Sequence, residues 1–308
     1  MRVAIVGLGN QGKKRLLSVK SDVICTVDPF DLNASYKDIS EVPLESFVAA
    51  FVCTPEAVKE NICSYLVKNS KHVLCEKPLT IGSIDRLFSL EKLALSKGIL
   101  LYVAYNHRFE PAIVEAKRII NSDVLGKLYS VRLFYGNGTA NLVKMSPWRD
   151  SGSGVIGDLL PHLLDTLCFW GLARPENLSL TSVHNFENNS PDYASISSVG
   201  KLPRLELEVT LCKWKNSFRC DILGESGSLH IDGLMKWGSV SLQVHRRVLP
   251  SGVPKVEEFN YPSGDPTWEL EYKYFKKSIE EGKVTDLSSE RYVRSQISSI
   301  ENKSLEIL

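Results

Sequence analysis

The sequence has no long apolar run and almost no net charge. Its longest apolar stretches, residues 48–53 and 99–105, are the size of strands, whereas about 20 apolar residues are needed to cross a bilayer. Lys and Arg number 37 against 36 Asp and Glu, which leaves a formal charge of +1. A chain balanced in this way offers no basic surface for nucleic acid or an anionic membrane. We therefore expect neither as a partner.

The chain also lacks paired cysteines and a secretory signal. None of its seven cysteines lies in a C-x-x-C pair, and most sit within or at the end of apolar runs, as small buried thiols do. The first apolar stretch ends at Leu8 and three basic residues follow at 13–15, where a secretory signal would continue its apolar core. These features predict a cytoplasmic protein with no metal site.

The 308 residues suggest two domains, and the first hundred residues alternate strands with helices. Strands are expected at residues 2–6, 23–27, 49–53, 72–75 and 99–104, and helices at 12–19, 56–68 and 83–97. Because these strands are continuously apolar and separated by helices, they predict a parallel sheet covered on both faces. Residues 1–122 are therefore expected to form a doubly wound α/β domain.

The pattern changes after about residue 125. Residues 205–211, 218–222 and 240–244 alternate apolar with polar side chains, which is typical of antiparallel strands with one face on a core. Helices are expected at about 158–170, 268–281 and 289–308. We predict an α+β domain over residues 123–308, with an open, mainly antiparallel sheet. The closing helices, about 268–308, can pack back on the first domain.

A glycine-rich loop follows the first strand. It reads Gly7-Leu8-Gly9-Asn10-Gln11-Gly12, a G-x-G-x-x-G. Such glycines allow a tight turn, a close approach to a pyrophosphate and close packing of the next helix, whose N-terminal N–H groups face the anion. The alternative is that these glycines only turn a tight corner between strand and helix. The context favours a dinucleotide held by Gly7, Gly9, Asn10, Gln11 and Gly12.

Asp28 ends the second strand, sixteen residues beyond Gly12. An acid at this place accepts hydrogen bonds from the adenosine ribose hydroxyls and repels a 2′-phosphate. Asp28 thus predicts NAD rather than NADP, although it can also be a turn residue before Pro29.

Further motifs follow in a fixed order along the chain. They are Thr54-Pro55, Glu76-Lys77-Pro78, Tyr105-Asn106-His107-Arg108-Phe109, Pro147-Trp148-Arg149, Asp158…His162…Asp165 and Gly224-Glu225-Ser226-Gly227-Ser228-Leu229. With the glycine-rich loop, they resemble the Gfo/Idh/MocA family, the glucose–fructose oxidoreductase and inositol dehydrogenase group. The resemblance spans residues 2 to about 231. It implies a Rossmann domain followed by a substrate-binding and oligomerisation domain.

The resemblance also implies roles for individual residues. The lysine of Glu-Lys-Pro contacts the nicotinamide region and the reacting hydroxyl in the family, and Lys77 matches it. Asp158 and His162 match the Asp-x-x-x-His pair, in which histidine is the general acid/base. Lys77, Asp158 and His162 are therefore the expected catalytic residues. The expected cofactor contacts include Thr54, Pro55, Glu76 and Lys77, and the expected substrate contacts are Tyr105, Asn106, Arg108, Trp148, Arg149, Asp158 and His162.

Asp158 and His162 also have purely structural interpretations, and the sequence differs from the family pattern at two positions. Asp158 can instead cap a helix N-terminus, and His162 can be a core histidine on a Leu-rich helix. Leu160 stands where the family commonly has Gly, and Lys59 stands where many members have His.

The expected function is that of an NAD(P)-dependent oxidoreductase. It would transfer a hydride between nicotinamide, NAD in preference to NADP, and a secondary alcohol or ketone of a sugar, inositol or nucleotide-sugar. The alternatives are a dinucleotide-binding regulatory protein without turnover and an enzyme that cleaves glycosides through transient oxidation. The resemblance further implies a homodimer or homotetramer formed through the polar face of the antiparallel sheet.

Overall fold

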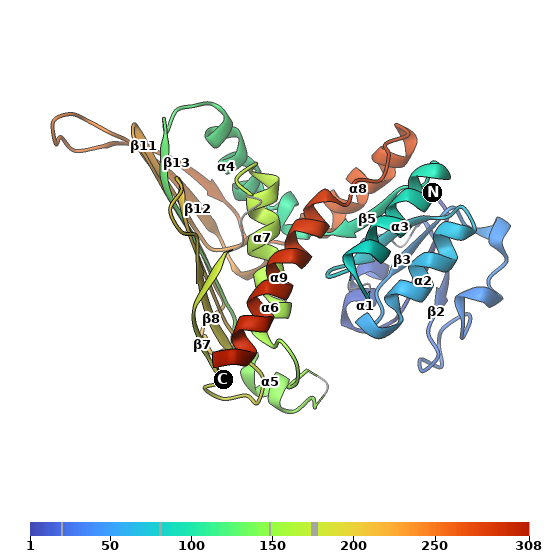
Figure 1. The fold of residues 1–308 in the computed structure, drawn as a ribbon. Helices are drawn as coiled ribbons and strands as arrows, with labels where there is room; N and C mark the ends of the chain where they lie inside the picture. The colour runs from blue at the N-terminus through green and yellow to red at the C-terminus, as the bar shows by residue number, and fades with distance from the viewer. Residues whose placement is uncertain (20, 80–81, 148, 174–177, 308) are drawn as a thin grey trace. The chain divides into compact units, whose positions relative to one another are not determined.

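The computed structural model of the chain describes residues 1–19, 21–79, 82–147, 149–173 and 178–307 (Figure 1). Two compact units divide it. The first consists of Met1–Asn106 and Thr267–Arg291, and the second of His107–Pro266 and Tyr292–Leu308. The division differs from the predicted boundary at residues 122 and 123. The first unit ends sixteen residues earlier and includes a helix from the C-terminal part of the chain.

The first unit contains a five-stranded parallel sheet with the order β2-β1-β3-β4-β5. Its strands are β1 Val3–Val6, β2 Val23–Val27, β3 Ala49–Val52, β4 His72–Glu76 and β5 Leu101–Ala104. Its helices are α1 Asn10–Ser18, α2 Glu56–Lys68, α3 Ile84–Ser96 and α8 Thr267–Glu280, with 3-10 turns η1 Ile39–Glu41 and η2 Leu44–Ser46. The predicted doubly wound sheet is confirmed.

Both faces of this sheet are buried, which explains why its strands are continuously apolar. On one face, Phe51 packs edge-on against Tyr272 and Phe275 of α8, with 5.8 Å between ring centroids in each pair. On the other face, α2 and α3 pack against the alternate strand residues, such as Val52 and Val73.

A buried charge network links three elements of the first unit. Arg15 of α1 is 0% exposed. Its Nε donates to Glu76 at the end of β4 at 2.7 Å, and its Nη2 donates to Glu271 of α8 at 2.5 Å. The guanidinium also lies 4.4 Å from the centroid of the Trp268 ring. Burial raises the pKa of the Glu271 carboxyl to about 7, although Arg15 acts in the opposite direction.

The second unit contains an eight-stranded sheet with the order β13-β12-β11-β10-β6-β9-β8-β7. Its strands are β6 Leu128–Gly136, β7 Ser179–His184, β8 Tyr193–Ser197, β9 Arg204–Thr210, β10 Ser217–Gly224, β11 Gly227–Asp232, β12 Val240–Arg246 and β13 Lys255–Tyr261. Strands β6 and β9 pair in parallel, and the other neighbouring strands pair antiparallel. The predicted, mainly antiparallel sheet is confirmed.

Helices cover one face of this sheet, and its opposite, polar face carries no helix among the described residues (Figure 1). The helical segments are η3 Asn106–Phe109, α4 Pro111–Asn121, α5 Ala140–Lys144, α6 Val155–Asp158, α7 Leu160–Phe169, η4 Met235–Trp237 and α9 Ser288–Ile307. Two of these segments, η3 and α9, begin within the first unit and continue into the second. Alternate residues of β9, including Leu205 and Leu207, join the core under the helices.

The helix predicted over about residues 158–170 is α7, Leu160–Phe169. Asp158 is instead the last residue of a separate short helix, α6. Pro161 lies in the first turn of α7, where its missing N–H leaves no intrahelical hydrogen bond unmade. The chain therefore starts a new helix at this point instead of continuing the old one.

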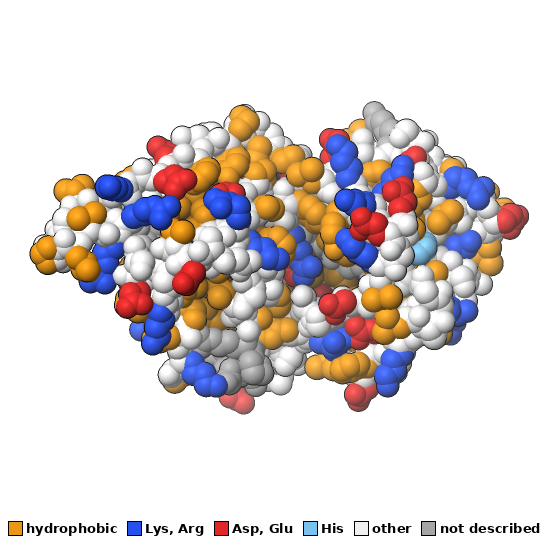
Figure 2. Space-filling model, turned by 90° about the horizontal axis from the view of Figure 1, so that it is seen from above, with side chains coloured by type: hydrophobic (Ala, Val, Ile, Leu, Met, Phe, Trp, Pro, Cys, Tyr) orange, Lys and Arg blue, Asp and Glu red, His pale blue; other side chains and the backbone are white. Residues whose placement is uncertain are grey.

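Charges of both signs are interspersed over the face of the molecule that Figure 2 shows. In the described part of the chain, no helix combines the length and apolar character needed to cross a bilayer. The described residues also contain no group of three or more His, Cys, Asp or Glu side chains placed to hold a metal ion.

The Arg15 network generates a stability prediction. Arg15→Met should lower the free energy of unfolding by about 3–5 kcal/mol at pH 8, because it leaves buried carboxylates without their cation. The loss should be smaller at pH 5. Without Arg15 the pKa of Glu271 rises further above its unfolded value, so the fold favours the protonated carboxyl and loses stability as pH increases.

Urea unfolding at both pH values measures this effect. Arg86→Met is the matched control, since Arg86 pairs with Glu60 at 2.6 Å while 63% of its side chain is exposed. An exposed pair of this kind contributes about 1 kcal/mol or less. A loss at Arg15 no larger than at Arg86 would contradict the prediction.

Candidate active site

The loop between β1 and α1 requires glycine at two positions. Gly7 has a φ of +93°, and a Cβ there would lie 2.8 Å from the carbonyl oxygen of Cys53. A Cβ on Gly12 would lie 1.8 Å from the carbonyl oxygen of Gly7. At Gly9, by contrast, nothing lies within 4 Å of a Cβ position. The loop therefore makes a tight turn at Gly7 and Gly12 and leaves open space next to Gly9.

The N-terminus of α1 suits an anion. Gly9 is its N-cap, makes no side-chain capping bond, and no acidic residue lies in the first turn. Gly9, Asn10 and Gln11 are exposed. Unpaired N–H groups and the helix dipole favour a phosphate at such an end. After β3, the buried Oγ1 of Thr54 has no hydrogen-bond partner within the described residues. These features fit a dinucleotide, and Pro55 follows as the N-cap of α2.

Asp28 fixes the two loops on either side of it. Its Oδ2 accepts from the Leu8 N–H at 2.7 Å, and its Oδ1 accepts from the Phe30 and Asp31 N–H groups at 2.8 and 3.1 Å. Burial alone would raise the pKa of Asp28, but these hydrogen bonds outweigh it and lower the pKa. A carboxylate has about four acceptor sites, so the turn role leaves room for a ribose hydroxyl.

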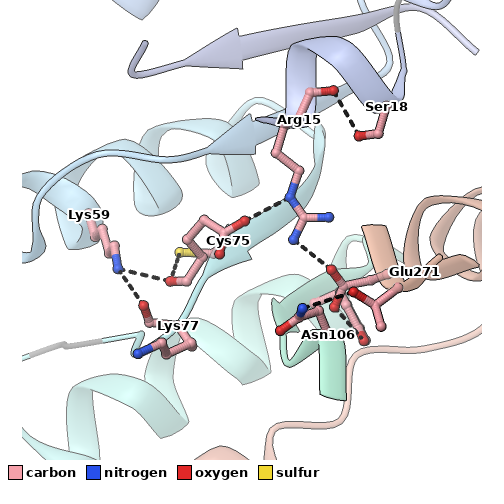
Figure 3. Close-up of polar contacts among 10 residues, drawn as sticks. Arg15, Ser18, Lys59, Cys75, Lys77, Asn106 and Glu271 are labelled. Atoms are coloured by element: carbon pink, nitrogen blue, oxygen red, sulfur yellow. Dashed lines mark hydrogen bonds and ion pairs between the residues drawn. The ribbon is translucent and has the colours of Figure 1, made fainter. Parts of the chain in front are cut away.

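Lys77 lies just beyond β4, in a loop whose backbone is held by other side chains (Figure 3). Lys59 of α2 donates to the carbonyl oxygens of Glu76, Lys77 and Pro78. The Glu76 carboxylate accepts from Arg15. Lys77 thus follows the carboxyl end of a parallel strand, and ligands of such sheets bind at this edge.

Two predicted substrate residues have packing partners in the first unit. Tyr105 is 1% exposed, and its Oη donates to Glu290 at 2.7 Å. This burial places Tyr105 in the core, which differs from the substrate wall expected from the sequence. Asn106 donates from Nδ2 to Thr267 Oγ1 at 2.9 Å.

In the second unit, His162 lies in the first turn of α7 and is 9% exposed. Its ring stacks on the ring of His107 with 4.3 Å between centroids, and Tyr135 packs edge-on at 5.7 Å. The leucines of this helix are buried, as expected if His162 were only a core histidine. The His162 ring, however, lies among side chains that can exchange protons.

Lys236 extends this cluster and is a residue that the sequence did not indicate. Its Nζ lies 3.1 Å from Tyr135 Oη and 3.4 Å from His107 Nε2. Burial lowers the pKa of Lys236 to about 8, against the opposing effect of Asp265, Glu110 and Asp158. His107 stood inside a quoted motif, but no local signal marks Lys236 in the turn after β11.

Asp158 is the last residue of α6 and does not cap α7, whose N-cap is Leu159. Its Oδ2 lies 3.6 Å from Arg149 Nη2. Arg108 donates two hydrogen bonds, at 2.8 and 2.5 Å, to the buried carboxylate of Asp165. Both predicted substrate arginines therefore have a carboxylate partner.

Trp148, the remaining predicted substrate residue, lies outside the described residues.

Comparison with known proteins agrees with this organisation. The family model described as "Oxidoreductase family, NAD-binding Rossmann fold" matches residues 1–105, and the model described as "GFO/IDH/MocA C-terminal domain" matches residues 113–230. Together the two matches cover well over half of the chain.

Curated relatives include an uncharacterized oxidoreductase from Schizosaccharomyces pombe, 27% identical over 226 residues, or 70% of this chain and 54% of that protein. Inositol 2-dehydrogenase 1 from Saccharopolyspora erythraea is 28% identical over 244 residues, which cover 75% of this chain and 66% of that protein. The chain spans only 30% and 53% of the length of two other relatives that it matches.

A solved structure of levoglucosan dehydrogenase, in complex with NADH and levoglucosan, has a TM-score of 0.82 to this chain at 18% identity. The match covers 99% of this chain and 97% of that one. At this identity the likeness shows the fold, while the two family models establish the relationship. The chain belongs to the Gfo/Idh/MocA family of NAD-binding oxidoreductases.

Proposed function

We propose that this protein is an NAD-dependent dehydrogenase that oxidises a secondary hydroxyl of a sugar or inositol, or reduces the corresponding ketone. The observation that carries the proposal is the environment of His162. Its ring stacks on His107 beside Tyr135 and Lys236, which gives it neighbours able to exchange a proton. A regulatory protein that only senses dinucleotide has no need of such a cluster.

In the proposed reaction, a bound nicotinamide would supply the acceptor for the hydride that leaves the carbinol carbon. His162 takes the hydroxyl proton as general base, and returns it in the reverse direction. Lys77 donates a hydrogen bond to the same oxygen and stabilises its developing negative charge. The loop at residues 7–12, with Asp28 and Thr54, would hold the cofactor. Asp158 would orient the site together with Arg149, its observed partner.

The charges of the second unit support an uncharged reacting ring. A phosphate or carboxylate binds best to a guanidinium with no other anion. Arg108 is already bonded in two places to Asp165, and Arg149 lies beside Asp158. We therefore propose a sugar or inositol whose reacting ring carries no anionic group.

The test is a turnover screen with NAD+ against free sugars and inositols, each paired with its phosphorylated form. Mass spectrometry of any dinucleotide retained on purification identifies the cofactor. Higher kcat/KM for the uncharged member of a pair is the expected result. A hydrolysed glycoside without net NADH would instead indicate transient oxidation, and dinucleotide binding without turnover of any pair would indicate a regulatory protein.

Two further parts of the proposal are a cytoplasmic location, which the seven free cysteines support, and a homodimer or homotetramer, which the resemblance implies. The surface proposed to join the copies is the polar face of the eight-stranded sheet, where Arg132 pairs with Glu206.

Asp28 predicts cofactor preference. NADH should bind about tenfold or more tightly than NADPH, because a 2′-phosphate beside an ionised carboxylate costs at least about 1.4 kcal/mol. Asp28→Asn keeps an acceptor oxygen and removes the charge, so it should reduce the ratio of NADH affinity to NADPH affinity. Fluorescence titration with both reduced cofactors measures it. Asp38→Asn, at a carboxylate that also accepts a backbone N–H, should leave the ratio unchanged. Equal affinities in the wild-type protein would contradict the assignment.

His162 predicts a loss of chemistry without a loss of cofactor binding, whereas Lys77, an expected nicotinamide contact, predicts a loss of chemistry together with weaker nicotinamide and substrate binding. His162→Ala should lower the rate of hydride transfer by about 10²–10⁴, and Lys77→Met should also lower it. Since both groups act on one oxygen in one transition state, the double variant should resemble the worse single variant. Pre-steady-state hydride transfer and NADH titration measure the two effects separately.

His184→Ala is the control for this experiment, because His184 is an exposed histidine of the same unit that pairs with Ser182. It should retain wild-type rates. Wild-type turnover in His162→Ala would reduce His162 to a packing residue.

A further inference from the structure

Lys59 makes an unusual set of contacts for a buried lysine. It lies on α2 and is 3% exposed. Its Nζ donates to three consecutive carbonyl oxygens, those of Glu76 at 2.9 Å, Lys77 at 3.3 Å and Pro78 at 3.0 Å. In Figure 3 its ammonium is turned toward the backbone of the loop that carries Lys77.

This arrangement uses the full capacity of the ammonium group. A lysine has three N–H donors and no acceptor, and here three carbonyl oxygens receive them. A buried charge is costly unless it is paired or fully hydrogen-bonded. Among the described residues, the hydrogen-bond partners of Lys59 are backbone carbonyls and not a carboxylate. The ammonium group of Lys59 is therefore stabilised by the three carbonyl oxygens of residues 76–78, which can reach it only in this conformation of the loop.

The same loop is fixed on its other sides. Arg15 holds the Glu76 carboxylate at 2.7 Å, and Glu290 of α9 accepts from the Leu79 N–H at 3.0 Å. Lys59 is the contact that reaches the peptide groups on both sides of Lys77. The direction in which the Lys77 side chain leaves the backbone thus depends on Lys59 more directly than on the other two.

We propose that Lys59 is a positioning residue for the reaction, which holds the backbone of residues 76–78 so that the Lys77 amine meets the reacting oxygen. The inference rests on the proposed role of Lys77. It assigns Lys59 to the chemical step and not to binding of the phosphates and ribose of the dinucleotide. The phosphate and ribose contacts proposed above come from residues 7–12 and Asp28, which Lys59 does not touch in the contacts described.

The experiment compares Lys59→Met, which keeps the apolar stem and removes the donors, with the wild-type protein. A displacement of about 1 Å at a catalytic group can cost about 10²-fold in rate. We expect kcat to fall about 10–100-fold, with KM for the sugar and the affinity for NADH changed by less than about threefold. Lys59→Arg retains a charged donor and should recover part of kcat.

The matched control is Lys71→Met. Lys71 is a half-buried lysine of the same unit whose Nζ donates to the Phe47 carbonyl at 3.0 Å. This substitution also removes a lysine-to-carbonyl bond, but not one to the Lys77 loop. Both variants should lose stability, and only Lys59→Met should lose kcat when each is assayed well below its own unfolding temperature.

A second readout does not depend on activity. Hydrogen–deuterium exchange of a peptide covering residues 76–79 should become faster in Lys59→Met and stay unchanged in Lys71→Met. Unchanged exchange would overturn the inference, and so would faster exchange with wild-type kcat, since the role of Lys59 would then be structural only. If the wild-type protein turns over no sugar or inositol, the proposed function fails. The difference in exchange of this peptide between the wild-type protein and Lys59→Met still shows whether Lys59 holds the loop.

Discussion

The guanidinium of Arg15 is the interaction on which the arrangement of the first unit most depends. It joins α1, the end of β4 and α8 through Glu76 and Glu271. Because α1 begins in the glycine-rich loop at residues 7–12 and β4 ends just before Lys77, one side chain connects both segments that we propose to contact the cofactor. Glu271 is 256 residues away in the sequence. The buried charge of Arg15 therefore has its full set of carboxylate partners only when a helix from the distant part of the chain packs on the N-terminal sheet.

The residues expected to do chemistry are held by residues that do none. In the first unit, Lys59 and Glu290 fix the backbone around Lys77. In the second, the ion pair of Arg108 and Asp165 joins η3 to α7, the same two segments that carry the stacked rings of His107 and His162. Burying such charges adds little net stability. What it provides is a defined geometry, because a buried charge with a full set of partners has few alternative positions.

Local patterns in the sequence were sufficient for the sheets and for the glycine-rich turn between β1 and α1. Continuous apolar strands indicated the parallel sheet, and alternation indicated the mainly antiparallel one, since each pattern follows from which faces are buried. The helix expected at 56–68 has those bounds in the structure. The glycines of the loop and Asp28 were also identifiable, because backbone constraints at a tight turn act over a few residues. The order of the motifs indicated the family.

Only the tertiary structure decided the contacts between distant segments. It joined Arg15 to Glu271, paired β6 with β9 in parallel, and buried Tyr105 against Glu290. It also brought Lys236 to His107 across 129 residues. A sequence records residue types and their spacing, whereas these contacts depend on which segments become neighbours when the cores close. Gly12 was fixed by its own short stretch of chain, since its close neighbour is Gly7, but the contact of Gly7 with Cys53 and the partners of Lys59 and His162 were fixed by packing.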